Sequence, residues 1–193
     1  MAPPTKPGYP LMNESEVDYI RNLVSKENTL FEWGSGNSTI FFSEIAKSVS
    51  SVEHNYYWFN RVNEEIKERQ INNVSLAWVR PNMPYRHFTN GHSLLMDMRG
   101  VEFSSYINAI NYFPERSYDF FVLDGRARPQ CAEMALSFCH ENTVVFMQEF
   151  YRARYSIALE WYDMEDRIEN MAVLKPKQKY LNWRPKMEMY PDG

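Results

Sequence analysis

The sequence predicts an α/β fold built on a doubly wound, mostly parallel sheet with helices on both faces. Three observations indicate this class. Short apolar stretches typical of strands alternate with longer stretches of helical periodicity, a glycine-rich turn joins the first strand to a helix, and no internal repeat interrupts the alternation. A chain of 193 residues lies in the range of one domain. We therefore expect a single domain over residues 1–193, with a proline-rich arm at residues 1–12.

In the first half of the chain, turn and capping signals separate the expected elements. Asn13 with Glu16 three residues later forms a capping-box pattern that starts a helix. Asn55 is placed to cap a second, longer helix through Arg69. The expected elements after the first helix are a strand at 29–33, a helix around 40–46, a strand at 49–53, the helix from 55 to 69 and a strand at 74–79.

The second half contains a segment without periodicity and then resumes the alternation. Residues 80–101 carry prolines and two histidines, and we expect them to form a long active-site loop. Beyond it we expect a helix at 103–112, a strand at 118–123, a helix at 129–138, a strand at 143–147 and a helix at 153–162. Residues 168–183 predict a C-terminal antiparallel hairpin turning at Lys175-Pro176-Lys177, at one edge of the sheet.

Charge and composition disfavour several classes of partner. The formal net charge is −4, so the chain lacks the basic footprint expected for nucleic acid or an anionic membrane. Its longest apolar runs are far shorter than the ~20 residues that span a bilayer. Only Cys131 and Cys139 are present, which indicates a reducing compartment. We expect a cytoplasmic protein with no nucleic-acid partner and no membrane association; the oligomeric state is left open.

The turn after the first strand is the main candidate for cofactor binding. Gly34-Ser35-Gly36 lies between a strand and a helix, where glycines let the backbone approach a bulky ligand. Glu53 closes the second strand, where a carboxylate can accept both hydroxyls of a ribose. The dinucleotide-binding pattern requires a third glycine at the position of Thr39, so a hydride-transfer enzyme is disfavoured.

Residues 31–39, Phe-Glu-Trp-Gly-Ser-Gly-Asn-Ser-Thr, resemble the acidic-x-Gly-x-Gly motif of class I S-adenosylmethionine-dependent methyltransferases, which have a Rossmann-like fold. The resemblance implies S-adenosylmethionine as cofactor. It also implies that the acid, Glu32, anchors the loop or the amino-acid end of the cofactor, and that Glu53 holds the ribose. The expected cofactor-binding residues are Glu32, Gly34, Ser35, Gly36, Ser38, Glu53, His54 and Asp124.

Residues 124–128 and 149–155 resemble one branch of this family, the sugar and glycan O-methyltransferases, which includes viral enzymes that modify capsid glycans. The resemblance implies methylation of a sugar hydroxyl on a glycan or glycoconjugate, with a carbohydrate partner and, for a viral protein, the host cytoplasm as location. Three alternatives stay open. They are a catechol-like small molecule as acceptor, a protein acceptor, and an inactive Rossmann-like protein that binds a nucleotide or cofactor.

Two carboxylates are expected to converge beside the acceptor. Asp124 and Glu149 follow neighbouring strands, about 5 Å apart in sheet spacing. They are candidates for a general base, or for a clamp that binds Mg²⁺ or Mn²⁺ as in metal-dependent relatives. Gln148-Glu149 departs from the paired aspartates expected at that place in the metal-dependent branch. His87, in the long loop, is a further candidate for the base.

Arginines are expected to bind an anion close to these acids. Arg126 and Arg128 precede a helix whose positive dipole end disfavours cations, so an anion is expected to offset them. A substrate phosphate, the cofactor carboxylate or a nearby acid such as Glu149 would do so, and an internal salt bridge is the structural alternative. The expected substrate-binding residues are Arg126, Arg128, Arg152, Tyr155 and Tyr106.

Overall fold

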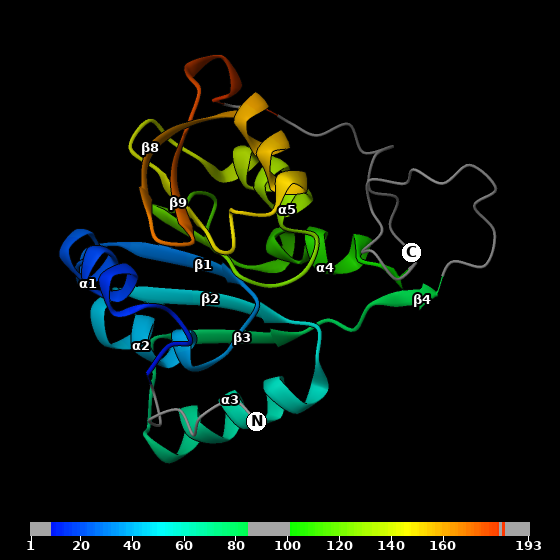
Figure 1. Cartoon of the computed structure of the whole chain (residues 1–193). Helices are drawn as coiled ribbons and strands as arrows, with labels where there is room; N and C mark the ends of the chain where they lie inside the picture. The colour runs from blue at the N-terminus through cyan, green and yellow to red at the C-terminus, as the bar shows by residue number, and fades with distance from the viewer. Residues whose placement is uncertain (1–8, 85–100, 182, 184–193) are drawn as a thin grey trace.

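A seven-stranded sheet forms the centre of the molecule (Figure 1). The computed structural model describes residues 9–84, 101–181 and 183, and it confirms the predicted fold class. The strand order is β3-β2-β1-β6-β7-β9-β8, with parallel pairing from β3 through β7 and an antiparallel pair, β9 and β8, at the edge. The strands are β1 (Thr29–Trp33), β2 (Ser48–Glu53), β3 (Val74–Trp78), β6 (Phe120–Leu123), β7 (Val144–Met147), β8 (Tyr162–Ile168) and β9 (Met171–Pro176).

Helices cover both faces of this sheet, as the alternation predicts. The α-helices are α1 (Glu14–Leu23), α2 (Asn37–Ile45), α3 (Tyr56–Glu68), α4 (Ser104–Asn108) and α5 (Arg128–Ala135). The 3₁₀ helices are η1 (Ala109–Tyr112), η2 (Leu136–Phe138), η3 (Ala153–Glu160) and η4 (Gln178–Tyr180). The predicted caps hold: Glu16 accepts the backbone N–H of Asn13, and the Asn55 side chain accepts the N–H of Tyr57 at the start of α3.

Alternating strand residues build two apolar cores. Leu30 and Val122 face α1 and α2, whereas Phe31, Trp33 and Phe121 face α4 and α5, because successive side chains of a strand point to opposite faces. All five are fully buried. Since both faces are covered, the central strands are apolar on both sides, which is typical of a parallel sheet.

The C-terminal hairpin differs in position from the sequence prediction. The structure places its turn at Glu169 and Asn170, where Ile168 pairs with Met171, and not at residues 175–177. Glu169 adopts a left-handed backbone with φ +50°. Pro176 ends β9 because a proline has no N–H to donate to the sheet. The residues predicted as the last helix form the 3₁₀ helix η3, and β8 starts at Tyr162.

The two ends of the predicted long loop pair with each other. Residues Asn82–Pro84 (β4) and Val101–Glu102 (β5) form a short antiparallel ladder outside the main sheet. Residues 85–100, which include His87, lie outside the described residues, and so do residues 1–8 of the predicted arm. In the part of the chain that is described, no helix has the length and apolar character required to cross a membrane.

Candidate active site

A cavity of about 580 Å³ opens at the carboxyl ends of the parallel strands. From the β1–β6 pair the sheet continues with β2 and β3 on one side and with β7 on the other, so the strand order reverses at this pair. In open α/β sheets ligands bind at such a reversal. The volume lies in the range of small-molecule sites. It is lined by Leu11, Gly34, Ser35, Gly36, Asn37, Ser38, Glu53, His54, Trp58, Asp124, Gly125, Arg126, Ala127, Arg128, Pro129, Gln130, Glu149, Arg152, Arg154, Tyr155 and Ile157.

The glycine turn after β1 packs directly on the turn after β6. Gly34 has φ +106°, and a Cβ atom there would lie 2.5 Å from the backbone nitrogen of Gly125. The N–H of Gly125 donates to the carbonyl of Trp33 at 2.7 Å. Only glycine satisfies both the left-handed backbone and this close approach. The two turns therefore form one continuous wall of the cavity.

Glu32 fixes the cofactor loop from below. Its carboxylate accepts hydrogen bonds from the hydroxyls of Ser38 and Thr39 at 2.5 Å and of Ser51 at 2.6 Å. The residue is fully buried and does not line the cavity. Burial raises the pKa of Glu32 to about 7, against the opposing effect of the hydroxyl donors. The acid thus anchors the loop to α2 and β2.

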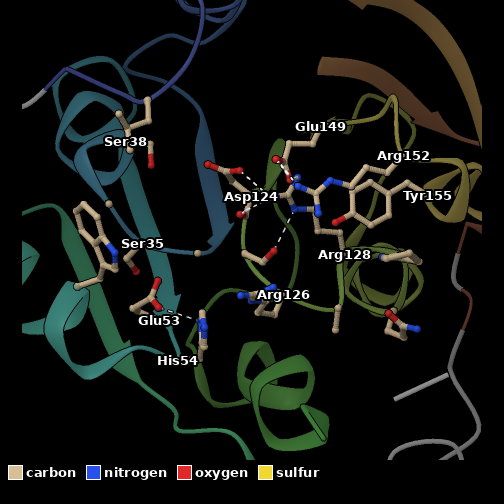
Figure 2. Close-up of a pocket in the computed structure, with 18 of the residues that line it drawn as sticks. Ser35, Ser38, Glu53, His54, Asp124, Arg126, Arg128, Glu149, Arg152 and Tyr155 are labelled. Carbon is tan, nitrogen blue, oxygen red and sulfur yellow. Dashed lines mark hydrogen bonds and ion pairs between the residues drawn. The ribbon is translucent and has the colours of Figure 1, made fainter. Parts of the chain in front are cut away.

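Glu53 presents a carboxylate at the end of β2, on the side of the cavity opposite Asp124 (Figure 2). Its Oε1 accepts the N–H of Asn55 at 2.7 Å and lies 2.9 Å from Nδ1 of His54. The His54 contact satisfies the distance of an ion pair but not the geometry of a hydrogen bond. Within the described residues, Oε2 of Glu53 has no partner, so one oxygen remains for a ligand.

On the other side, Arg128 joins the two acids that follow β6 and β7 (Figure 2). Its Nη2 donates to Oδ1 of Asp124 at 3.0 Å, and its Nη1 lies 3.1 Å from Oε2 of Glu149. Its guanidinium carbon also lies 5.4 Å from the centre of the Tyr155 ring. Arg152 donates to Oε1 of Glu149 at 2.6 Å. The predicted convergence of the two acids is therefore present, with a guanidinium between them.

Asp124 has the properties of a proton acceptor near neutral pH. Burial in the cavity wall raises its pKa to about 6; the Arg128 guanidinium lowers that value and the Glu149 carboxylate raises it. Its Oδ1 is held by Arg128, whereas Oδ2 has no partner among the described residues. An ionised carboxylate with a raised pKa is a stronger base than an ordinary one, which suits general-base catalysis.

Two residues of this wall have left-handed backbones without being glycine. Ala127 has φ +50° and Glu149 has φ +54°. Such conformations cost on the order of 1–3 kcal/mol and persist where the surrounding structure enforces them. The hydrogen bonds of Arg128 to the carbonyls of Gly125 and Gln148 span both turns and supply that enforcement.

The acids do not form the open metal clamp expected from the resemblance. A divalent ion bridging Asp124 and Glu149 would need oxygens that already face the Arg128 guanidinium. In residues 9–84 and 101–181, no group of three or more histidine, cysteine, aspartate or glutamate side chains is arranged to hold a metal ion. The donor set therefore does not fit Mg²⁺ or Mn²⁺.

The structure collects most of the predicted site residues at the cavity. Those that line it are Gly34, Ser35, Gly36, Ser38, Glu53, His54, Asp124, Arg126, Arg128, Glu149, Arg152 and Tyr155. Glu32 lies beneath the loop, and Tyr106 is fully buried in the core, because the helix that carries it turns this face toward β1 and Gly125. Tyr106 is therefore no wall residue, and His87 lies outside the described residues.

The predicted site residues omit eight side chains that line the cavity: Leu11, Asn37, Trp58, Ala127, Pro129, Gln130, Arg154 and Ile157. Trp58 lies in the first turn of α3, shortly after the strand that ends in Glu53. Its position near the cavity could therefore have been predicted from its place close to the end of that strand. Arg154 follows Arg152 by two residues in the segment already singled out. Leu11 and Ile157 carry no chemical signal, and only the three-dimensional fold brings them to the site.

Solved structures share this architecture along nearly the whole chain. A methyltransferase-like protein from Silicibacter pomeroyi DSS-3 matches with TM-score 0.70 and 19% identity, covering 88% of either chain. An rRNA methylase from Streptococcus thermophilus matches with TM-score 0.57 and 9% identity, covering 88% of this chain and 100% of its own. The chain has a methyltransferase fold. A candidate methyltransferase from Streptococcus mutans, solved in complex with S-adenosylhomocysteine (SAH), matches with TM-score 0.57, 10% identity and coverage of 86% and 100%.

Sequence comparison adds no closer relative. No protein-family model matches this chain, and the comparison with curated proteins finds no match. At these low identities the structural likeness establishes the methyltransferase fold, and the activity has to be argued from the site itself.

Proposed function

We propose that this protein is an S-adenosylmethionine-dependent methyltransferase. The observation that carries the proposal is the joint presence, in one cavity at the reversal of strand order, of the glycine loop at 34–38 and the Glu53 carboxylate. Glycine loop and acid are the two features that a nucleoside cofactor with an amino-acid tail requires. The S. mutans structure with SAH supports the choice of cofactor, since it has the same fold.

The residues divide between holding the cofactor and serving the acceptor. Oε2 of Glu53 is available to ribose hydroxyls, and the backbone of Gly34 and Gly36 offers a wall without side chains. When bound, the sulfonium cofactor supplies an activated methyl group. On the other side of the cavity, Asp124 is positioned to take the proton of an acceptor hydroxyl through Oδ2, while Arg128 holds its other oxygen.

We further propose that the acceptor is a sugar hydroxyl, on a glycan or glycoconjugate. The resemblance of residues 124–128 and 149–155 to sugar O-methyltransferases supports this, and so does the group of Arg152, Arg154 and Tyr155 at the acceptor side. Arginine side chains and an aromatic ring offer the hydrogen bonds and the flat apolar surface that saccharides use. Viral origin and a cytoplasmic location stay predictions.

Transfer of a labelled methyl group to matched panels of saccharides, catechols, peptides and RNA tests the acceptor class. We expect label in saccharides and none in RNA, because the chain is acidic overall and lacks a basic stripe. An Asp124→Asn variant, which keeps the shape of the side chain, is expected to lose transfer at least 100-fold while it still binds SAH. Label in catechol or RNA alone would refute the sugar proposal and leave the methyltransferase proposal standing.

A further inference from the structure

The Arg128 side chain is nearly buried in the cavity wall, with 7% of its surface exposed. Its Nε donates to the carbonyl of Gly125 at 3.0 Å, and its Nη2 donates to the carbonyl and Oδ1 of Asp124 at 2.8 and 3.0 Å. Its Nη1 donates to the carbonyl of Gln148 and lies 3.1 Å from Oε2 of Glu149. Four of these contacts are hydrogen bonds and the fifth, to Glu149, is an ion pair, so the guanidinium contacts five oxygens in all.

These contacts lie where a bridging cation would lie. Asp124 and Glu149 follow the ends of the paired strands β6 and β7, and Oδ1 of Asp124 and Oε2 of Glu149 both contact the guanidinium. Oε1 of Glu149 accepts from Arg152 at 2.6 Å. Three of the four carboxylate oxygens therefore already contact a guanidinium group, and only Oδ2 of Asp124 has no described partner.

We infer that the Arg128 guanidinium takes the place of a divalent metal ion in this site, so that the reaction runs without metal. A Mg²⁺ or Mn²⁺ ion requires several oxygens at about 2.0–2.6 Å. To obtain Oδ1 of Asp124 and Oε2 of Glu149 it would have to displace a buried cation from five oxygen contacts. Arg128 is a positioning residue: it holds Asp124 by one oxygen and leaves the other for the acceptor.

The statement about catalysis rests on the proposed function, whereas the exclusion of metal is a property of the free protein. The role in catalysis and the exclusion of metal can therefore be tested in separate experiments. If no methyl transfer is found with any acceptor, the proposed function fails, and the metal titration described next still decides whether Arg128 occupies the place of an ion.

Titration of the full chain with Mn²⁺ alone, followed by calorimetry or by the EPR signal of free Mn²⁺, tests the inference. We expect no stoichiometric binding to the unmodified protein. Arg128→Met frees Oδ1 of Asp124 and Oε2 of Glu149, and the variant is expected to bind Mn²⁺ at least tenfold more tightly than the unmodified protein does. Arg154→Met, which removes a cavity arginine without a carboxylate contact among the described residues, is the matched control and should gain no such affinity.

Adding Asp124→Asn to Arg128→Met should abolish the gained Mn²⁺ site. Equal Mn²⁺ affinity of the unmodified protein and a folded Arg128→Met variant would overturn the inference. If Arg128→Met does not fold, the Mn²⁺ titration of the unmodified protein decides, and stoichiometric binding there would overturn the inference. Methyl transfer that is unchanged within twofold after exhaustive chelation supports the inference, and transfer that is lost on chelation and restored by Mn²⁺ overturns it.

Discussion

Two carboxyl groups, Glu32 and Asp124, show how neighbouring side chains determine what an acid does. Glu32 is enclosed by three hydroxyl donors beneath the loop, and it has no access to the cavity. Asp124 faces the cavity with one oxygen held by Arg128 and the other without a described partner. Burial raises the pKa of both groups, but only Asp124 is placed to exchange a proton with a substrate. Glu32 therefore holds the loop in place, whereas Asp124 is placed to take part in the reaction.

The raised pKa of Glu32 predicts a dependence of stability on pH. The folded chain holds this proton up to about pH 7, whereas the unfolded chain releases it near the ordinary value of 4.5. The contribution of Glu32 to the free energy of unfolding is therefore complete below about pH 4.5. It falls as the pH rises to about 7, by roughly 3 kcal/mol in all. Glu32→Gln, which has no proton to release, should flatten the change.

Urea unfolding of the unmodified protein and of Glu32→Gln at intervals from pH 5 to 8 measures this effect. Asp124 contributes a loss in the same direction up to about pH 6, so the variant should keep part of the slope. Identical slopes for the two proteins between pH 6 and 7 would show that Glu32 does not titrate there.

At the scale of elements, the turn between β1 and α2 contains two glycines with different tasks. Gly34 has a left-handed backbone and touches the turn at Gly125, so the fold requires it. Gly36 has φ −170°, which any residue adopts, and a Cβ atom there would contact only the Ser38 hydroxyl, at 3.8 Å. Gly36 lines the cavity, so its lack of a side chain serves the ligand.

Alanine at each position separates these tasks. Gly34→Ala is expected to lower the free energy of unfolding by about 2–4 kcal/mol, because it adds backbone strain and a clash. Gly36→Ala should change it by less than about 1 kcal/mol, since the lost N-cap preference and the reduced entropy of the unfolded chain offset each other. Gly36→Ala should nevertheless weaken SAH binding at least tenfold. Unaltered SAH affinity would remove Gly36 from the site.

Local signals predicted the parallel core well, because caps, glycine turns and apolar periodicity are written into neighbouring residues. The starts at Asn13 and Asn55 and the strands that carry Glu32 and Glu53 are examples. The hairpin was misplaced because its turn at Glu169 uses a left-handed glutamate, for which the sequence has no marker. Where a strand turns depends on its partner strand, and that is not a local property.

At the scale of the whole molecule, the site depends on the strand order. Residues that end β1, β2, β6 and β7 meet at one edge of the sheet, which makes a single cavity from segments more than 100 residues apart. The strand-end rule therefore predicted most of the site from sequence. It gave the contact of Arg128 with Glu149 only as one of several alternatives, and it did not predict that Tyr106 faces the core, because side-chain direction follows from packing.

Calorimetric titration of the full chain with SAH, beside NAD and ATP, tests the central claim most directly. We expect one SAH per chain and no binding of the other two. At an SAH concentration 100 times the Kd, the native state should gain about 2.7 kcal/mol, which corresponds to a rise of roughly 5–10 °C in Tm. Glu53→Ala should weaken SAH binding about tenfold or more, as the loss of one carboxylate acceptor would. Binding of NAD or ATP with no response to SAH would contradict the assignment of this cavity.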